Sequence, residues 1–157
     1  MYYISHLAAA IFIFSAVLTG CQTKEEEPAK NPLQTQEQKT ADEKVIKVRY
    51  YDSGKVETET EYVGDKRNGM HKLFDEQGNL ISVVRYENDK MEGLLKTYYS
   101  DGTLKAVVPY EKGIVNGEMI VYFETGKTFR KQIYEQGKLK STKQYTPDGK
   151  LEFEDNF

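Results

Sequence analysis

The chain has 157 residues and a formal net charge of −3, with 38% hydrophobic and 30% charged residues. This length allows one modest domain, and the low apolar content favours a thin architecture with much wetted surface. Basic and acidic residues alternate along the chain, so there is no one-sign patch of the kind that binds nucleic acid. The single cysteine excludes an intrachain disulfide and a metal site built on cysteines.

Residues 1–20 are typical of an export signal. Residues 7–19 form an uncharged, mostly apolar run, which is shorter than the ~20 residues of a membrane-spanning helix. The run ends in Leu-Thr-Gly-Cys, with the cysteine at position 21. This ending resembles the lipobox of bacterial lipoproteins, and the resemblance implies cleavage before Cys21 and a lipid on its thiol. The chain would then be exported and attached to the cell envelope, at the outer membrane where the bacterium has one. The alternative is an uncleaved hydrophobic segment.

Residues 21–44 have the composition of a disordered tether. Beyond the cysteine they contain two prolines, many charged or amide side chains, and one aliphatic residue larger than alanine, Leu33. Such a segment buries too little apolar surface to offset its ordering entropy. The acidic triplet at residues 25–27 resembles signals that send some lipoproteins to the cell surface, although a solvated linker explains it equally simply. The folded part is therefore expected at residues 45–157.

A period of about 24 residues organises residues 45–157. Glycines recur with spacings of 24, 24, 24 and 23 residues, an aromatic residue precedes each by four positions, and a tyrosine follows the first four by eight. The recurring glycines are Gly54, Gly78, Gly102, Gly126 and Gly149, and the units close on Gly69, Gly93 and Gly117. Because glycine supplies the positive φ of tight turns, both sets are predicted to be turn residues.

The segments between the glycines favour β-strands. Residues 56–62 alternate strictly, residues 80–86 and 104–110 are rich in β-branched residues, and residues 96–99 and 119–123 are also strand-like. If Asp101-Gly102 is a two-residue loop, Tyr99 pairs with Leu104, and the more apolar face holds Leu95, Thr97, Ala106, Val108 and Tyr110. We therefore predict an all-β fold, a single-layer antiparallel meander of two-strand units, each stabilised by its neighbours. Pro109 is expected to mark a bulge in its strand or a position outside the hydrogen-bonded ladder.

The unit of tyrosine, turn glycine and closing Asn-Gly resembles the bacterial variant of the MORN repeat. That variant occurs in lipoproteins and in proteins labelled toxin–antitoxin system antitoxin component, YwqK type. The resemblance extends over residues 50–151, and the fourth unit lacks the closing glycine. It implies a β-hairpin repeat fold and, through the label, a role in neutralising a toxin.

No constellation of catalytic residues is evident. The only histidines are His6, in the export signal, and His71, which occupies the repeat position of Leu95 and Met119 and is expected to lie half covered on the sheet. Glu57, Glu59 and Glu61 could imitate an acidic metal site, but alternating charges are usual on a wet strand face. The expectation is a protein without catalysis, metal or cofactor.

The aromatic residues provide the candidate interaction surface. One column precedes the turn glycines and consists of Tyr50, Phe74, Tyr98, Tyr122 and Tyr145. A second column consists of Tyr62, Tyr86, Tyr110 and Tyr134. Tyrosines are enriched in interfaces, although the same columns can be packing ladders of the sheet. We hypothesise a lipid-anchored module that binds a protein, such as a toxin; the alternative is a structural lipoprotein or one that binds an envelope glycan, such as peptidoglycan.

Overall fold

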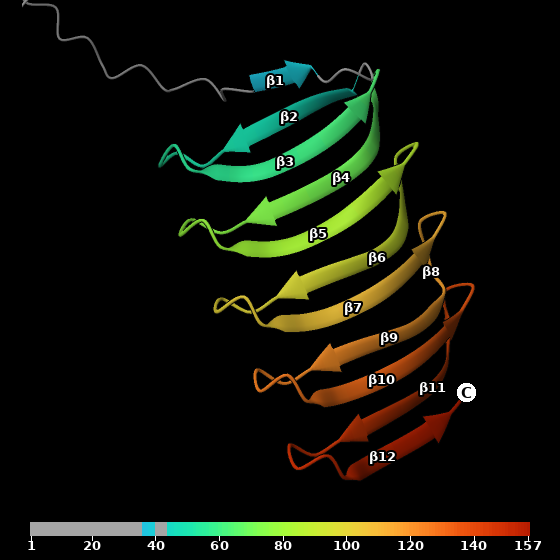
Figure 1. Ribbon diagram of the computed structural model, residues 1–157. Coiled ribbons are helices and arrows are strands. Elements are labelled where there is room, and N and C mark those ends of the chain that lie inside the picture. The colour runs from blue at the N-terminus through green and yellow to red at the C-terminus, as the bar shows by residue number, and fades with distance from the viewer. Residues whose placement is uncertain (1–35, 40–43) are drawn as a thin grey trace, which may run out of the picture. The chain divides into compact units, whose positions relative to one another are not determined.

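The computed structural model describes residues 36–39 and 44–157, which form one open antiparallel sheet (Figure 1). Hydrogen-bonded neighbours follow chain order from β1 to β12, except that the short β8 pairs only with β7. The predicted all-β meander is confirmed. The export signal, Cys21 and the first part of the tether lie outside the described residues. Within the described residues, no helix is long and apolar enough to span a bilayer.

The strands are short and nearly uniform in length, as the repeat period requires. Their bounds are β1 Gln36–Lys39, β2 Lys44–Tyr50, β3 Val56–Val63, β4 Lys66–Phe74, β5 Leu80–Glu87, β6 Lys90–Tyr98, β7 Leu104–Glu111, β8 Ile114–Val115, β9 Gly117–Tyr122, β10 Thr128–Glu135, β11 Lys138–Tyr145 and β12 Leu151–Asn156. Each unit therefore contributes two strands, as the period predicts.

The five recurring glycines lie in the loops along one edge of the sheet, which we call the glycine edge (left in Figure 1). At the first loop the Gly54 amide donates to the Tyr51 carbonyl at 2.9 Å, and the Tyr51 amide donates to the Lys55 carbonyl at 2.8 Å. Gly54 has a φ of 81°, so the loop is a three-residue turn with a bulge. The other four loops repeat these bonds.

This loop geometry corrects the predicted two-residue turn at Asp101-Gly102. The Tyr99 amide donates to the Thr103 carbonyl, and Tyr98 pairs with Leu104, so the predicted Tyr99–Leu104 pair does not form. The bulge absorbs the extra residue, because Thr97 pairs with Ala106 and the strand interior keeps the predicted register.

At the opposite edge the chain reverses direction in two-residue loops, and the closing glycines do not lie in these loops. Asn88 and Asp89 connect β5 to β6 with φ values of 48° and 67°, which is the type I′ signature. Gly69 and Gly93 instead lie inside β4 and β6, where the pairing register shifts, and Gly117 begins β9. Their prediction as turn residues is wrong because a bulge also requires the positive φ that only glycine adopts easily.

One face of the sheet is better covered than the other. The alternation of side chains along each strand and the cross-strand register together show which side chains lie on the same face. Five of the six buried residues that have a side chain, Thr60, Val84, Tyr86, Ala106 and Thr142, fall on the face that we call the covered face. Val48 lies on the other, open face. Within residues 44–157 no large side chain is fully buried, which is expected of a sheet without a second layer.

Pro109 interrupts the sheet as predicted. It lies inside β7, whose ladder to β9 involves Ala106 and Val107, whereas Tyr110 and Glu111 pair with β8. Proline has no amide proton to donate, and the neighbouring strand breaks into β8 and β9 opposite it. The Asn116 amide at the break still donates to the Pro109 carbonyl at 3.0 Å.

The N-terminal end of the sheet differs from expectation, and the C-terminal end leaves apolar side chains exposed. Gln36–Lys39, which the composition assigns to the disordered tether, form β1 and pair with β2. Backbone pairing with an edge strand does not require apolar side chains, which explains how a polar segment adds a strand. At the other end, Leu151, Phe153 and Phe157 remain 50–67% exposed, so β12 closes the ladder without burying its apolar side chains.

The Gly69 bulge gives a stability prediction. A Cβ at Gly69 would lie 2.7 Å from the Glu61 Cβ at a φ of 129°, whereas a Cβ at Gly54 meets nothing within 4 Å. Gly54→Ala should therefore cost about 1–2 kcal/mol of backbone strain. Gly69→Ala should cost roughly 1–3 kcal/mol more, because Glu61 and its strand must move. Urea unfolding of the two variants measures the difference. Equal losses would show that the β3–β4 bulge is not packed as described.

Candidate functional site

The five aromatic residues of the first column lie together along the glycine edge. Each is the last residue of its strand, and four of the five partners are aliphatic: Tyr50 pairs with Val56, Phe74 with Leu80, Tyr98 with Leu104, Tyr122 with Thr128, and Tyr145 with Leu151. By strand alternation all five belong to the open face. All are half-buried, so each ring has both a packed and an exposed part. We call this set the aromatic row.

Two equivalent grooves lie beside the aromatic row, two units apart. One groove of about 300 Å³ is lined by Asn79, Leu80, Tyr98, Ser100, Asp101 and Gly102. The other, of about 510 Å³, is lined by Gly126, Lys127, Thr128, Lys131, Tyr145, Asp148 and Gly149. In each groove an aromatic ring lies beside the first residues of a strand and the next Asp-Gly loop. The period of the sequence therefore produces a recurring site.

An ionised carboxylate lies at both grooves, and at the second it is paired with Lys150 at 3.1 Å, with Lys127 and Lys131 also in the lining. The Thr103 amide donates to Asp101 Oδ1 at 2.8 Å, and this hydrogen bond lowers the pKa of the Asp101 carboxyl below 3.8. The Thr146 hydroxyl donates to Asp148 Oδ1, and this hydrogen bond also lowers the pKa of the Asp148 carboxyl. Both loops therefore present an ionised carboxylate beside an aromatic ring at neutral pH.

Side chains of one unit hold the loops of the next. The Tyr51 hydroxyl donates to the Phe74 carbonyl oxygen at 2.7 Å, and the Tyr99 hydroxyl donates to the Tyr122 carbonyl oxygen at the same distance. The Lys127 ammonium donates to the Pro147 carbonyl oxygen at 2.9 Å. These bonds fix the backbone of the aromatic row, which reduces the entropy lost when a partner binds.

The second tyrosine column belongs to a different surface. Tyr62, Tyr86, Tyr110 and Tyr134 lie on the covered face near the opposite edge. Three of them pair with a closing glycine: Gly69 with Tyr86, Gly93 with Tyr110, and Gly117 with Tyr134. Tyr86 is only 6% exposed, and the Arg67 guanidinium lies 4.0 Å from its ring centre. This column packs within the sheet, and the two columns do not form one surface.

The glutamates of β3 are paired with separate cations. Glu57 accepts a hydrogen bond from Arg49 at 2.8 Å, and Glu59 accepts one from Lys72 at 2.9 Å. The Glu61 side chain lies against Gly69. In the described part of the chain, no three His, Cys, Asp or Glu side chains are close enough together to hold a metal ion.

His71 lies half-buried on the covered face, as its repeat position predicts. Its Nδ1 is 2.7 Å from the Thr60 hydroxyl oxygen, and its ring meets the Tyr86 ring edge-on at 5.9 Å between centroids. Burial lowers the pKa of His71 below 6.5, and the charges of Arg67 and Arg49 lower it further. The imidazole is therefore mainly neutral at pH 7.

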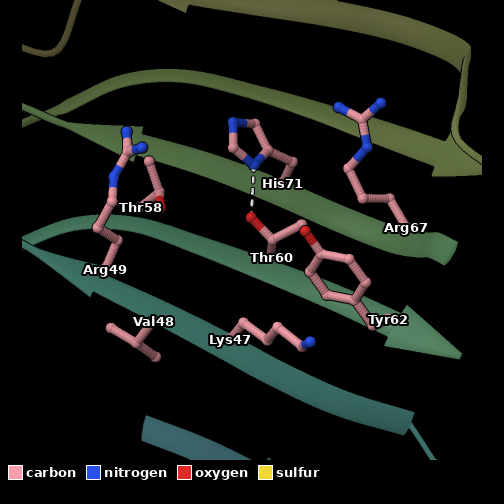
Figure 2. Close-up of a pocket in the computed structure, with 8 residues that line it drawn as sticks. All are labelled: Lys47, Val48, Arg49, Thr58, Thr60, Tyr62, Arg67 and His71. Carbon is pink, nitrogen blue, oxygen red and sulfur yellow. Dashed lines mark hydrogen bonds between the residues drawn. The ribbon is translucent and has the colours of Figure 1, made fainter. Parts of the chain in front are cut away.

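A polar cavity that the sequence analysis did not single out lies around His71. It has a volume of about 300 Å³, and Figure 2 shows the residues that line it on β2, β3 and β4. They are Lys47, Val48, Arg49, Thr58, Thr60, Tyr62, Arg67 and His71. Comparison with the positions 48 residues later would have found it, because that unit carries mostly apolar residues there.

Comparison with protein families supports the repeat assignment. The MORN repeat variant family matches residues 46–63 and 91–112. Each matched segment contains one hairpin of the glycine edge, β2–β3 or most of β6–β7, and the two hairpins lie two units apart. No curated protein matches the chain. The chain thus contains MORN repeat variants at two places within a sheet whose other hairpins have the same geometry.

The environment of His71 predicts a pH dependence of stability. Because its pKa is lowered in the folded chain, the unfolded chain binds more protons just below pH 6.5, and stability falls as the pH drops through that range. His71→Leu, which introduces the residue found at the equivalent Leu95, should remove this part of the dependence. Urea unfolding at about pH 5 and about pH 7.5 measures it. An unchanged difference between the two pH values would contradict the assignment.

Proposed function

We propose that this chain is a non-enzymatic, lipid-anchored module that binds a protein along the aromatic row. The carrying observation is the alignment of five equivalent aromatic residues on one face of a regular sheet. At Phe74 and Tyr122 a tyrosine of the preceding unit also holds the end of the strand in place. Aromatic rings offer large contact area at low entropy cost, and a pre-ordered backbone reduces the cost further.

The alternation of apolar and charged groups suits a protein partner. Leu80 and Tyr98 provide apolar surface in one groove, while Asp101 adds an ionised carboxylate at its rim. Protein interfaces combine an apolar, aromatic centre with a polar rim in this way. A partner with basic residues flanking an apolar segment would complement the row.

The location of the module follows from the resemblance at Cys21. Two or more acyl chains give stable membrane attachment where a single chain does not. We propose that Cys21 holds the chain in the cell envelope and that it has no catalytic role. The label of the YwqK-type proteins suggests a toxin as partner, with this chain acting as its antitoxin or immunity factor.

A second candidate function is binding of an envelope glycan. Each groove places a tyrosine ring beside an ionised aspartate, at Tyr98 with Asp101 and at Tyr145 with Asp148. An aromatic ring packs against the apolar face of a sugar, and carboxylates accept hydrogen bonds from its hydroxyls. Co-sedimentation with purified peptidoglycan tests this candidate, and absence of the chain from the pellet would end it.

A photo-reactive residue introduced at Ser100 tests the protein-binding proposal in intact cells. Ser100 is exposed in a groove of the aromatic row, and the matched control at Glu87 is exposed at the opposite edge. We expect a discrete protein adduct from position 100 and none from position 87. Mass spectrometry of the adduct identifies the partner. Adducts from both positions, or from neither, would contradict a partner on the aromatic row.

Tyr98→Ala combined with Tyr122→Ala should reduce formation of that adduct. The loss is expected to be about tenfold or more, since interface tyrosines often contribute 1.4 kcal/mol or more. Tyr110→Ala combined with Tyr134→Ala is the matched control, because it removes two half-buried tyrosines from the covered face. Circular dichroism checks folding of both pairs. Full adduct formation by a folded Tyr98/Tyr122 variant would exclude the row as the contact.

A further inference from the structure

The cavity around His71 is lined by an unusual number of hydrogen-bond donors. Lys47, Arg49 and Arg67 provide three permanent positive charges, and Thr58, Thr60 and Tyr62 provide hydroxyls. No aspartate or glutamate is among these described lining residues. In Figure 2 the basic side chains and the Thr60–His71 pair surround one region over β3 and its neighbours. The cavity is thus built for a negatively charged group.

Two of the cations are held by carboxylates that do not line the cavity. Glu57 binds Arg49 at 2.7 Å, and Asp89 binds Arg67 at 3.2 Å. A guanidinium has five N–H donors, so a carboxylate on one side leaves donors for a second anion. Lys47 lies 4.8 Å from the centre of the Tyr62 ring. These contacts orient the three cations before any ligand arrives, which favours binding.

The repeat provides an internal comparison for this cavity. The positions 48 residues later are Leu95, Thr97, Ala106, Val108, Tyr110, Val115 and Met119, which replace Lys47, Arg49, Thr58, Thr60, Tyr62, Arg67 and His71 respectively. Five of these seven residues are aliphatic or methionine. Three of the cross-strand pairs are repeated there, because Leu95–Val108, Thr97–Ala106 and Tyr110–Val115 correspond to Lys47–Thr60, Arg49–Thr58 and Tyr62–Arg67. Packing of the sheet therefore does not require the polar set, and a ligand explains why it gathers in one place.

We propose that this cavity binds a phosphate group, either free or esterified to a small molecule. A phosphate has more oxygens than a carboxylate, so it can accept hydrogen bonds from the donors that Arg49 and Arg67 keep beside their carboxylates and from several hydroxyls. A volume of about 300 Å³ lies at the lower end of the range for small-molecule sites. The site lies on the covered face, so it is independent of the aromatic row and of the proposed function.

Nuclear magnetic resonance titration of the full chain tests the proposal. The probes are inorganic phosphate and glycerol phosphate, with acetate as the carboxylate comparison. Saturable shifts should centre on Thr58, Thr60 and the His71 ring with both phosphates, and acetate should bind at least about tenfold more weakly. Tighter binding of glycerol phosphate would identify a phosphate ester as the ligand class, and equal binding would identify free phosphate.

The repeat supplies variants that preserve packing. Lys47→Leu combined with Arg67→Met introduces the residues found at Leu95 and Met91, and it should weaken phosphate binding about tenfold or more. Arg85→Gln combined with Lys96→Gln removes the same charge from exposed positions of the open face and should leave binding unchanged. Thr60→Val, which introduces the residue at Val84, is a nearly isosteric second variant if the first does not fold.

Three results would overturn the phosphate site. They are shifts that are absent or lie away from the cavity, equal phosphate affinity in a folded cavity variant, and acetate binding as tight as phosphate binding. Equal weakening in the Arg85/Lys96 control would also overturn it, because the effect would then reflect net charge alone.

Discussion

In the part of the chain that the structure describes, every unit is covered only by its neighbours, because one sheet forms there without a second layer. Only six residues with a side chain are buried between positions 44 and 157, and none of the large side chains there is buried completely. Stability must come from the backbone ladder, from cross-strand pairs and from the side chains that reach the next unit, such as Tyr51 and Tyr99. This constraint explains why the 24-residue period is so regular: a unit out of register would expose both of its neighbours.

Because the sheet has only one layer, its two faces have different roles. On the covered face three tyrosines of the second column pair with the closing glycines, so this face mainly stabilises the sheet. On the open face the aromatic row lies beside loops that are already fixed, which leaves it available for a partner. The cavity around His71 is an exception on the covered face, since polar side chains there replace residues that later units use for packing.

The sequence predicted the order of the strands and the place of one set of turns, because glycine spacing and strand alternation are local signals. It did not distinguish a glycine in a turn from a glycine in a bulge, since both need a positive φ; Gly69 and Gly93 are the examples. It missed β1, whose pairing depends on a neighbouring backbone rather than on its own polar side chains. It also missed the cavity, because Lys47 and Arg49 on β2 come to line one cavity with Arg67 on β4 only through the cross-strand register.

The central claim is that successive units lie side by side in one sheet, and distances between spin labels on the glycine edge test it most directly. Asp52, Ser100 and Glu124 occupy the same exposed loop position in different units, and Cys21→Ser gives a background without other thiols. Strands about 4.8 Å apart add about 9.6 Å per unit, so the account predicts backbone separations near ~19 Å for positions 52 and 100 and ~29 Å for positions 52 and 124, somewhat reduced by curvature. Separations that fail to increase with the number of intervening units would contradict it.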